Sequence, residues 1–162
     1  MATKVLDSWA LMALFNGEPA AGDVETLLWQ GAADRHKLLM SVVNWGEIYY
    51  SVMRGASPAM AEQKAREIAA MPIEIVPADL PLTHQAAIFK ATHKMSYADC
   101  FAAALAKQSK AELVTGDTEF KQLEKEIKIL WLMSGRPPQN RGVRCSDQPI
   151  STQAQFVTEP PT

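Results

Sequence analysis

The sequence predicts an α/β fold, a doubly wound and mainly parallel sheet of about five strands with helices on both faces. Short aliphatic runs alternate along the chain with longer segments whose apolar residues recur every three or four positions. Parallel strands need such segments between them, because the chain must cross back before it starts the next strand. Acidic residues also follow several of the runs, which puts them at the carboxyl ends of strands, where open α/β sheets bind ligands.

The expected elements follow from aliphatic runs, caps and helix breakers. Ser, Asp and Asn side chains satisfy the free N–H groups of a first helical turn, whereas Gly and Pro end helices. Ser57 and Pro58 form a start signal of this kind, and Pro72 closes the same helix. The strands are expected at 4–6, 38–43, 73–76, 113–115 and 127–132, and the helices are expected to open at Ser8, Asp23, Asn44, Ser57, Asp79, Ser96 and Glu119.

The segment 96–119 combines a helix, a strand and a tight turn with two acids. Ser96 caps the helix and puts Asp99 on its first turn, where free N–H groups and the helix dipole favour an anion. Asp117 follows the strand after Gly116, which lets the chain turn sharply. Each acid alone has a structural alternative, since Asp99 fits a Ser-x-x-Asp capping pattern and Asp117 fits a cap of the next helix.

Length and composition indicate one globular domain. The chain has 162 residues, of which 48% are hydrophobic and 21% charged, and its net charge of −2 gives no sign of an extended nucleic-acid surface. The apolar run 5–15 is too short to span a bilayer, and the two cysteines form neither a disulfide framework nor a zinc motif. We therefore expect a cytosolic protein without membrane contact. Its domain should cover 1–133, because the Pro-, Ser-, Thr- and Gln-rich segment 134–162 predicts a disordered tail.

Four acids are expected to meet at one edge of the sheet. Asp7, Glu47 and Asp117 each come just after a strand, and Asp99 begins a helix packed beside them. Carboxylates in a partly desolvated cleft repel one another, and a divalent cation relieves that repulsion. Mg²⁺ and Mn²⁺ prefer oxygen ligands, and such ions activate water and stabilise charge on a phosphate. The acids therefore predict phosphodiester hydrolysis rather than acyl transfer, which needs a Ser or Cys nucleophile with a base.

Motifs in the same places resemble the PIN domain, and within it the VapC-type toxins of bacterial toxin–antitoxin pairs. The resemblance covers roughly residues 3–132. It implies a doubly wound PIN fold and Mg²⁺- or Mn²⁺-dependent cleavage of RNA that leaves a 5′-phosphate. It also implies a homodimer that a cognate antitoxin holds inactive. The motifs are Val5-Leu6-Asp7-Ser8, the helix start 44–47, Ser96-Tyr97-Ala98-Asp99 and Leu113-Val114-Thr115-Gly116-Asp117.

The resemblance also implies roles for individual residues. Asp7, Asp99 and Asp117 would face the metal, and Glu47 would complete the set and help to orient the attacking water. Glu119 is a further candidate acid, although a Glu on a first turn is also a common helix feature. Supporting roles, in hydrogen bonds or in positioning the Glu47 turn, would fall to Ser8, Thr115 and Asn44.

Two other functions stay open. The chain could be a PIN nuclease of RNA processing without an antitoxin, or an RNA- or protein-binding module that kept the fold and lost activity. The presence of all four acids argues against the second. A dinucleotide-binding domain is excluded because no Gly-rich turn follows the first strand. Residues without ligand or nucleophile spacing, and therefore not expected to be catalytic, are His36, His84, His93 and Cys100.

Overall fold

The structure is a computed structural model that describes residues 1–132. The predicted tail 134–162 lies outside the described residues, as does Met133, the last residue of the predicted domain. In chain order the elements are β1 (Ala2–Leu6), α1 (Ser8–Phe15), α2 (Ala21–Ala32), β2 (His36–Ser41), α3 (Val42–Gly55), α4 (Pro58–Ala69), β3 (Ile73–Val76), α5 (Leu80–Thr92), α6 (Tyr97–Gln108), β4 (Glu112–Thr115), the 3₁₀ helix η1 (Thr118–Leu123) and β5 (Ile129–Trp131).

The strands of residues 1–132 form one parallel sheet in the order β3-β2-β1-β4-β5. The chain extends the sheet from β1 through β2 to β3, and then returns to add β4 and β5 on the other side of β1. Val5 of β1 pairs with Leu39 of β2, and Leu6 of β1 pairs with Val114 of β4. This arrangement confirms the predicted fold class. It also creates a switch point between β1 and β4, where ligands of open α/β sheets bind.

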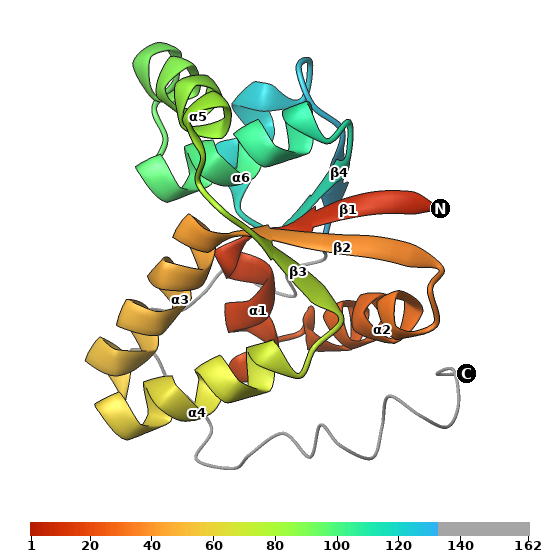
Figure 1. The fold of residues 1–162 in the computed structure, drawn as a ribbon, viewed down its shortest axis with the longest axis vertical. Coiled ribbons are helices and arrows are strands. Elements are labelled where there is room, and N and C mark those ends of the chain that lie inside the picture. Colours follow the sequence, from red (N-terminus) through yellow and green to blue (C-terminus); the bar gives the residue numbers. More distant parts are fainter. Residues whose placement is uncertain (133–162) are drawn as a thin grey trace.

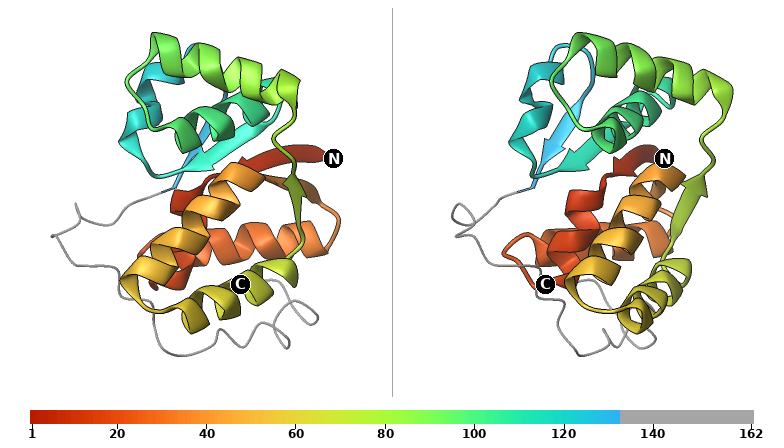
Figure 2. Two further views of the ribbon diagram at one scale, coloured as in Figure 1. Left: turned by 60° about the vertical axis from the view of Figure 1, so that its left-hand side comes forward. Right: turned by 90° about the vertical axis from the view of Figure 1, so that its left-hand side faces the viewer.

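Helices cover both faces of the sheet (Figure 1), as parallel strands require. The helices α1 to α4 lie on one face, and α5, α6 and η1 lie on the other, as the turned views in Figure 2 also show. Neighbouring residues of β1 serve the two layers, because Leu6 packs in the core with α1 and Val5 packs in the core with α6. Ala102, Ala103, Ala104 and Ala106 of α6 are buried, so this helix can lie close to the sheet beside the end of β1.

The start of α3 differs from the prediction. The strand β2 ends at Ser41, whose hydroxyl oxygen accepts a hydrogen bond from the Val43 N–H at 3.2 Å and caps α3. The prediction that Asn44 caps this helix is therefore wrong, as is the extension of the strand to Val43. Asn44 lies buried in the first turn, and Glu47 lies one turn further on. The β-branched residues Val42 and Val43 favour a strand locally, but tertiary packing overrides that preference.

Other boundaries hold or shift by a few residues. The predicted caps of α4, α5 and α6 are confirmed, because each side chain accepts a hydrogen bond from a first-turn N–H. Asp23 is not a cap, since α2 begins at Ala21 and Asp23 lies in its first turn. The predicted helix at 119–126 is the shorter η1, which Asp117 caps, and the last strand is the shorter β5. No helix within residues 1–132 is long and apolar enough to cross a membrane.

Candidate active site

The predicted acids gather beyond the carboxyl ends of β1 and β4. Asp7 directly follows β1, Asp117 shortly follows β4, and Asp99 lies on the first turn of α6. The negative charges of Asp99 and Asp117 act on Asp7, and those of Glu47 and Glu119 act on Asp99. These carboxylates therefore form one electrostatically coupled group rather than lying on separate surfaces of the molecule.

Asp7 is a buried acid at the head of α1, with 1% of its surface exposed. Its Oδ1 atom accepts a hydrogen bond from the Ala10 N–H at 3.0 Å and caps α1, and its Oδ2 atom accepts one from the Thr115 hydroxyl at 2.6 Å. Burial is the main reason that the pKa of Asp7 is raised to about 8. The two hydrogen bonds oppose that shift, and the charges of Asp99 and Asp117 add to it.

Thr115 joins two of the acids. It is fully buried, and its hydroxyl donates to Asp7 Oδ2 while its oxygen accepts a hydrogen bond from the Asp117 N–H at 3.0 Å. The loop after β4 is thereby held at a fixed position relative to Asp7. This geometry is compatible with the supporting role expected for Thr115, which stays a prediction.

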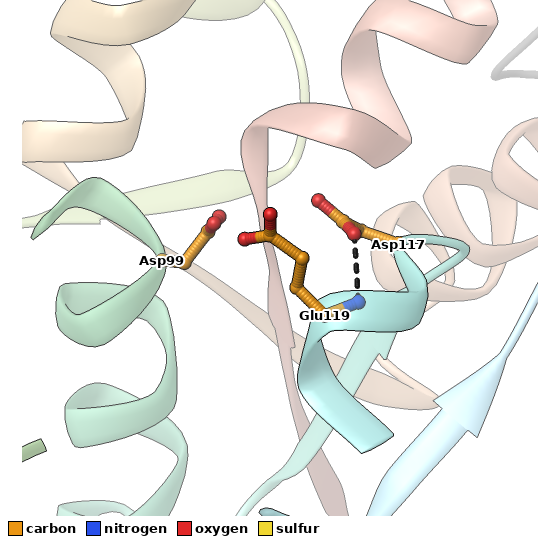
Figure 3. Close-up of side chains that lie close together, drawn as sticks. All are labelled: Asp99, Asp117 and Glu119. Carbon is orange, nitrogen blue, oxygen red and sulfur yellow. Dashed lines mark hydrogen bonds between the residues drawn. The ribbon is translucent and has the colours of Figure 1, made fainter. Parts of the chain in front are cut away.

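Asp99, Asp117 and Glu119 point toward one another (Figure 3). Asp99 comes from α6, and the other two come from the beginning of η1. One carboxylate oxygen from each of the three lies within 4.8 Å of the others, so a single cation could reach all of them. Glu119, expected only as a further candidate, belongs to this closest group. Asp7 and Glu47 lie outside it, although both are coupled to Asp99 by charge.

The capping alternatives describe how two of these acids are held. The Ser96 hydroxyl oxygen accepts a hydrogen bond from the Asp99 N–H at 3.1 Å, and Asp117 Oδ1 accepts one from the Glu119 N–H at 2.9 Å. Both residues nevertheless direct carboxylate oxygens into the cluster. Capping and clustering are therefore compatible, since the caps orient the side chains that meet there.

The donor set fits a hard divalent cation. Within residues 1–132, the ion pairs that form all involve other acids, so no lysine, arginine or histidine neutralises this group. The pKa of Asp99 is raised to about 6, mainly by burial and then by the charges of Asp117, Glu47 and Glu119, while the Ser96 hydroxyl lowers it. Uncompensated carboxylates that offer only oxygen ligands suit Mg²⁺ or Mn²⁺ better than a softer metal.

Asn44 links the segments that carry the acids. Its side chain is fully buried, and its NH₂ group donates to the Ser8 hydroxyl at 3.2 Å and to the Ala98 carbonyl at 3.1 Å. The Ser8 hydroxyl in turn lies 3.3 Å from the Asn44 carbonyl oxygen and donates to it. Ser8 follows Asp7, and Ala98 precedes Asp99. Asn44 therefore contacts the segments that carry Asp7 and Asp99. Its expected role in positioning the Glu47 turn stays a prediction.

Trp9 packs against the turn that carries Asp117, a contact that sequence reasoning did not predict. A Cβ atom added at Gly116 would lie only 2.2 Å from the nearest carbon of the Trp9 ring. Gly116 does not have a positive φ. Among residues 1–132, Gly17 is the glycine with that conformation. The close approach of Trp9, rather than a sharp turn, is therefore the reason that a glycine is needed here.

Gly116→Ala is expected to lower the free energy of unfolding by about 1–3 kcal/mol, because the new methyl group forces the Trp9 ring or the turn to move. Urea unfolding followed by circular dichroism measures this change. Gly22→Ala is the matched control, since a Cβ atom at Gly22 would meet nothing within 4 Å. Equal stability of the two variants would mean that Trp9 moves aside without cost.

The chain is similar to a known family in sequence and to solved structures in fold. Residues 4–126 match the family model described as the PIN domain. No curated protein matches the sequence. Among solved structures, one chain of DNA-bound VapBC from Salmonella typhimurium is 15% identical with a TM-score of 0.65, and the match covers 82% of this chain and 100% of that one. VapBC2 from Rickettsia felis, bound to a fragment of promoter DNA, gives 15% identity, a TM-score of 0.64 and coverages of 81% and 99%.

A third solved structure comes with a stated activity. VapC20 from Mycobacterium tuberculosis, a sarcin–ricin loop cleaving toxin, is 18% identical to this chain with a TM-score of 0.60. The match covers 74% of this chain and 93% of VapC20. At such identities these structures establish a shared fold, which agrees with the sheet order and layers described above.

Proposed function

Because the chain belongs to the PIN-domain family, we propose that it is a metal-dependent endoribonuclease that hydrolyses RNA phosphodiester bonds. The observation that carries the proposal is the group formed by Asp99, Asp117 and Glu119, with oxygens within 4.8 Å of one another and no cationic partner within residues 1–132. A group of this kind can hold a divalent cation between itself and the negatively charged RNA backbone. Without the cation, the acids would repel that backbone.

Each acid has a proposed part in the reaction. Asp99 and Asp117 would hold Mg²⁺ or Mn²⁺ together with Asp7, and Glu119 adds a further oxygen donor close to the first two. When bound, the ion supplies Lewis-acid stabilisation of charge that develops on the phosphate. Glu47 would help to orient the attacking water from α3. Its charge already acts on Asp99, which supports a position near the cation.

Buried polar residues hold the segments that carry these acids in fixed relative positions. Thr115 joins Asp7 to the loop that carries Asp117. Asn44 joins Ser8, the residue after Asp7, to Ala98, the residue before Asp99. Such fixed positions matter because catalysis by a cation depends on ligands that are already placed when the substrate binds.

We further propose that the nuclease is the toxin of a toxin–antitoxin pair, a cytoplasmic homodimer held inactive by an antitoxin. Support comes from its fold, which it shares with proteins solved as VapBC complexes. The alternative is a PIN nuclease of RNA processing without an antitoxin. A small open reading frame directly upstream that encodes a DNA-binding protein, and whose co-expression relieves growth inhibition, would distinguish the first from the second.

The chemistry is tested by RNA cleavage with and without metal. We expect the purified full chain to cut RNA endonucleolytically and leave 5′-phosphates, EDTA to abolish cleavage, and Mg²⁺ or Mn²⁺ to restore it. Full activity in EDTA would contradict the metal mechanism. Tight binding of Mn²⁺ without cleavage of any RNA tested would favour an inactive binding module instead.

A further inference from the structure

Gln122 is an exposed residue of η1, and both the oxygen and the nitrogen of its side-chain amide form hydrogen bonds with backbone groups. Its Oε1 atom accepts a hydrogen bond from the Lys94 N–H at 3.3 Å. Its Nε2 atom donates to the Lys94 carbonyl at 3.1 Å and to the Glu119 carbonyl at 2.9 Å. The amide therefore bonds both the N–H and the carbonyl of Lys94 in the α5–α6 connection, and it also bonds the carbonyl of Glu119 in η1.

The two residues that Gln122 contacts border the acidic group. Lys94 lies just before Ser96, whose hydroxyl oxygen accepts the Asp99 N–H, and Glu119 itself belongs to the group. Asp99 reaches the site from α6, whereas Asp117 and Glu119 reach it from η1. Gln122 thus connects the two chain segments whose separation decides how far apart these carboxylates lie.

Repulsion between the acids favours their separation, and contacts between their segments oppose it. Like charges close together push their segments apart, and no cationic side chain within residues 1–132 pairs with them. The α5–α6 connection is also held from its other side, because Lys90 Nζ donates to the Met95 carbonyl at 2.6 Å. Core packing of Phe120 and Leu123 places η1 beside α6. The hydrogen bonds of Gln122 add a direct link between η1 and the α5–α6 connection, whose other side is held by α5.

We propose that Gln122 is a positioning residue that sets the distance between Asp99 and the pair Asp117 and Glu119, and thereby the affinity of the site for a divalent cation. The role as a cation site rests on the proposed function, whereas the connection between the two segments does not. In this proposal Gln122 acts through the backbone of both segments and not as a ligand of the cation.

The test compares Gln122→Met with Gln108→Met in the full chain. Methionine keeps the length of the side chain but removes its hydrogen bonds, and Gln108 is an exposed glutamine of α6 for which no side-chain hydrogen bond is found within residues 1–132. Calorimetric titration of the metal-free proteins with Mn²⁺ gives the dissociation constant. Hydrogen exchange of metal-free protein reports the amides of 94–99 and 117–122, and RNA cleavage gives kcat and KM separately.

We expect Gln122→Met to weaken Mn²⁺ binding by about tenfold, which is the lower end of the range usual for residues that orient metal ligands. Exchange in both segments should become faster, and kcat at a fixed metal concentration should fall more than KM rises. Gln108→Met should match the wild type in all three measurements. A role in stability alone would lower the melting temperature but leave the Mn²⁺ affinity of the folded protein unchanged, and that result would overturn the proposal.

The two proposals fail in different ways. If the wild type binds no Mn²⁺, the metal-dependent function is wrong and Gln122 cannot tune metal affinity. Exchange in the metal-free protein is then still informative, because unchanged protection of 94–99 and 117–122 in Gln122→Met would show that the amide does not hold the segments together. If the wild type binds Mn²⁺ but the variant binds it equally well, only the role of Gln122 is refuted.

Discussion

Asp99→Asn is expected to reduce RNA cleavage by at least about 100-fold, more than is usual when a residue merely orients a metal ligand. The carboxylate is one of three whose oxygens lie within 4.8 Å of one another, and asparagine lacks the charge that attracts the cation. Initial rates on a labelled RNA at saturating Mg²⁺ measure the loss, and Mn²⁺ titration shows whether metal binding falls with it.

Asp79→Asn is the control for the loss of a carboxylate at the start of a helix outside the acidic group. Asp79 caps α5 by accepting a hydrogen bond from the Leu82 N–H at 2.9 Å, and asparagine caps helices about as well as aspartate. Asp79→Asn should therefore keep activity within about twofold of the wild type. If Asp99→Asn were equally mild, Asp99 would be a first-turn helix acid and the metal mechanism would lose its central residue.

The fold could be predicted from the sequence because its signals are local and agree with one another. Aliphatic runs, Ser and Asp caps and the alternation of strands with helices all indicate the same parallel sheet. The error at α3 arose where a local signal was misleading, since Val42 and Val43 read as the end of a strand. Ser41 was the better cap, but its position inside an apparent strand concealed it.

The site was predictable only in part. Asp7 and Asp117 could be placed because residues after parallel strands meet at one edge, and the capping signal at Ser96 placed Asp99 beside them. The sequence could not show that Glu119, and not Glu47, lies within 4.8 Å of Asp99 and Asp117. Those positions depend on where α3 starts and on how η1 turns. The contact of Trp9 with the turn at Gly116 and the hydrogen bonds of Gln122 have no sequence signal, because they exist only after distant segments pack.

Asp7→Asn is expected to stabilise the metal-free protein at alkaline pH. The pKa of Asp7 is raised to about 8 in the folded state, so the folded protein holds this proton while the unfolded chain loses it near pH 4. Between these values the folded state binds more protons, and stability falls as the pH rises toward 8. Asparagine has no proton to lose and can still accept from Ala10, so it avoids this cost.

The advantage of asparagine over aspartate should grow by about 3–4 kcal/mol between about pH 5 and about pH 8.5, as expected for a shift of this direction and size. Urea unfolding in EDTA at both pH values gives this difference directly, and any constant effect of the substitution cancels from it. An advantage that stays the same at both pH values would mean that Asp7 ionises freely in the folded protein, in conflict with its burial at the end of β1.

Adding Mn²⁺ should reverse the order of the two proteins. A cation that binds only the folded state raises its stability with concentration, and it does so most where the ligands are ionised. Wild type at alkaline pH should therefore gain stability on adding Mn²⁺, whereas Asp7→Asn should gain much less. The acid that destabilises the empty fold is then the same one that strengthens the loaded site. A gain in Asp7→Asn equal to that of the wild type would instead remove Asp7 from the metal-facing set.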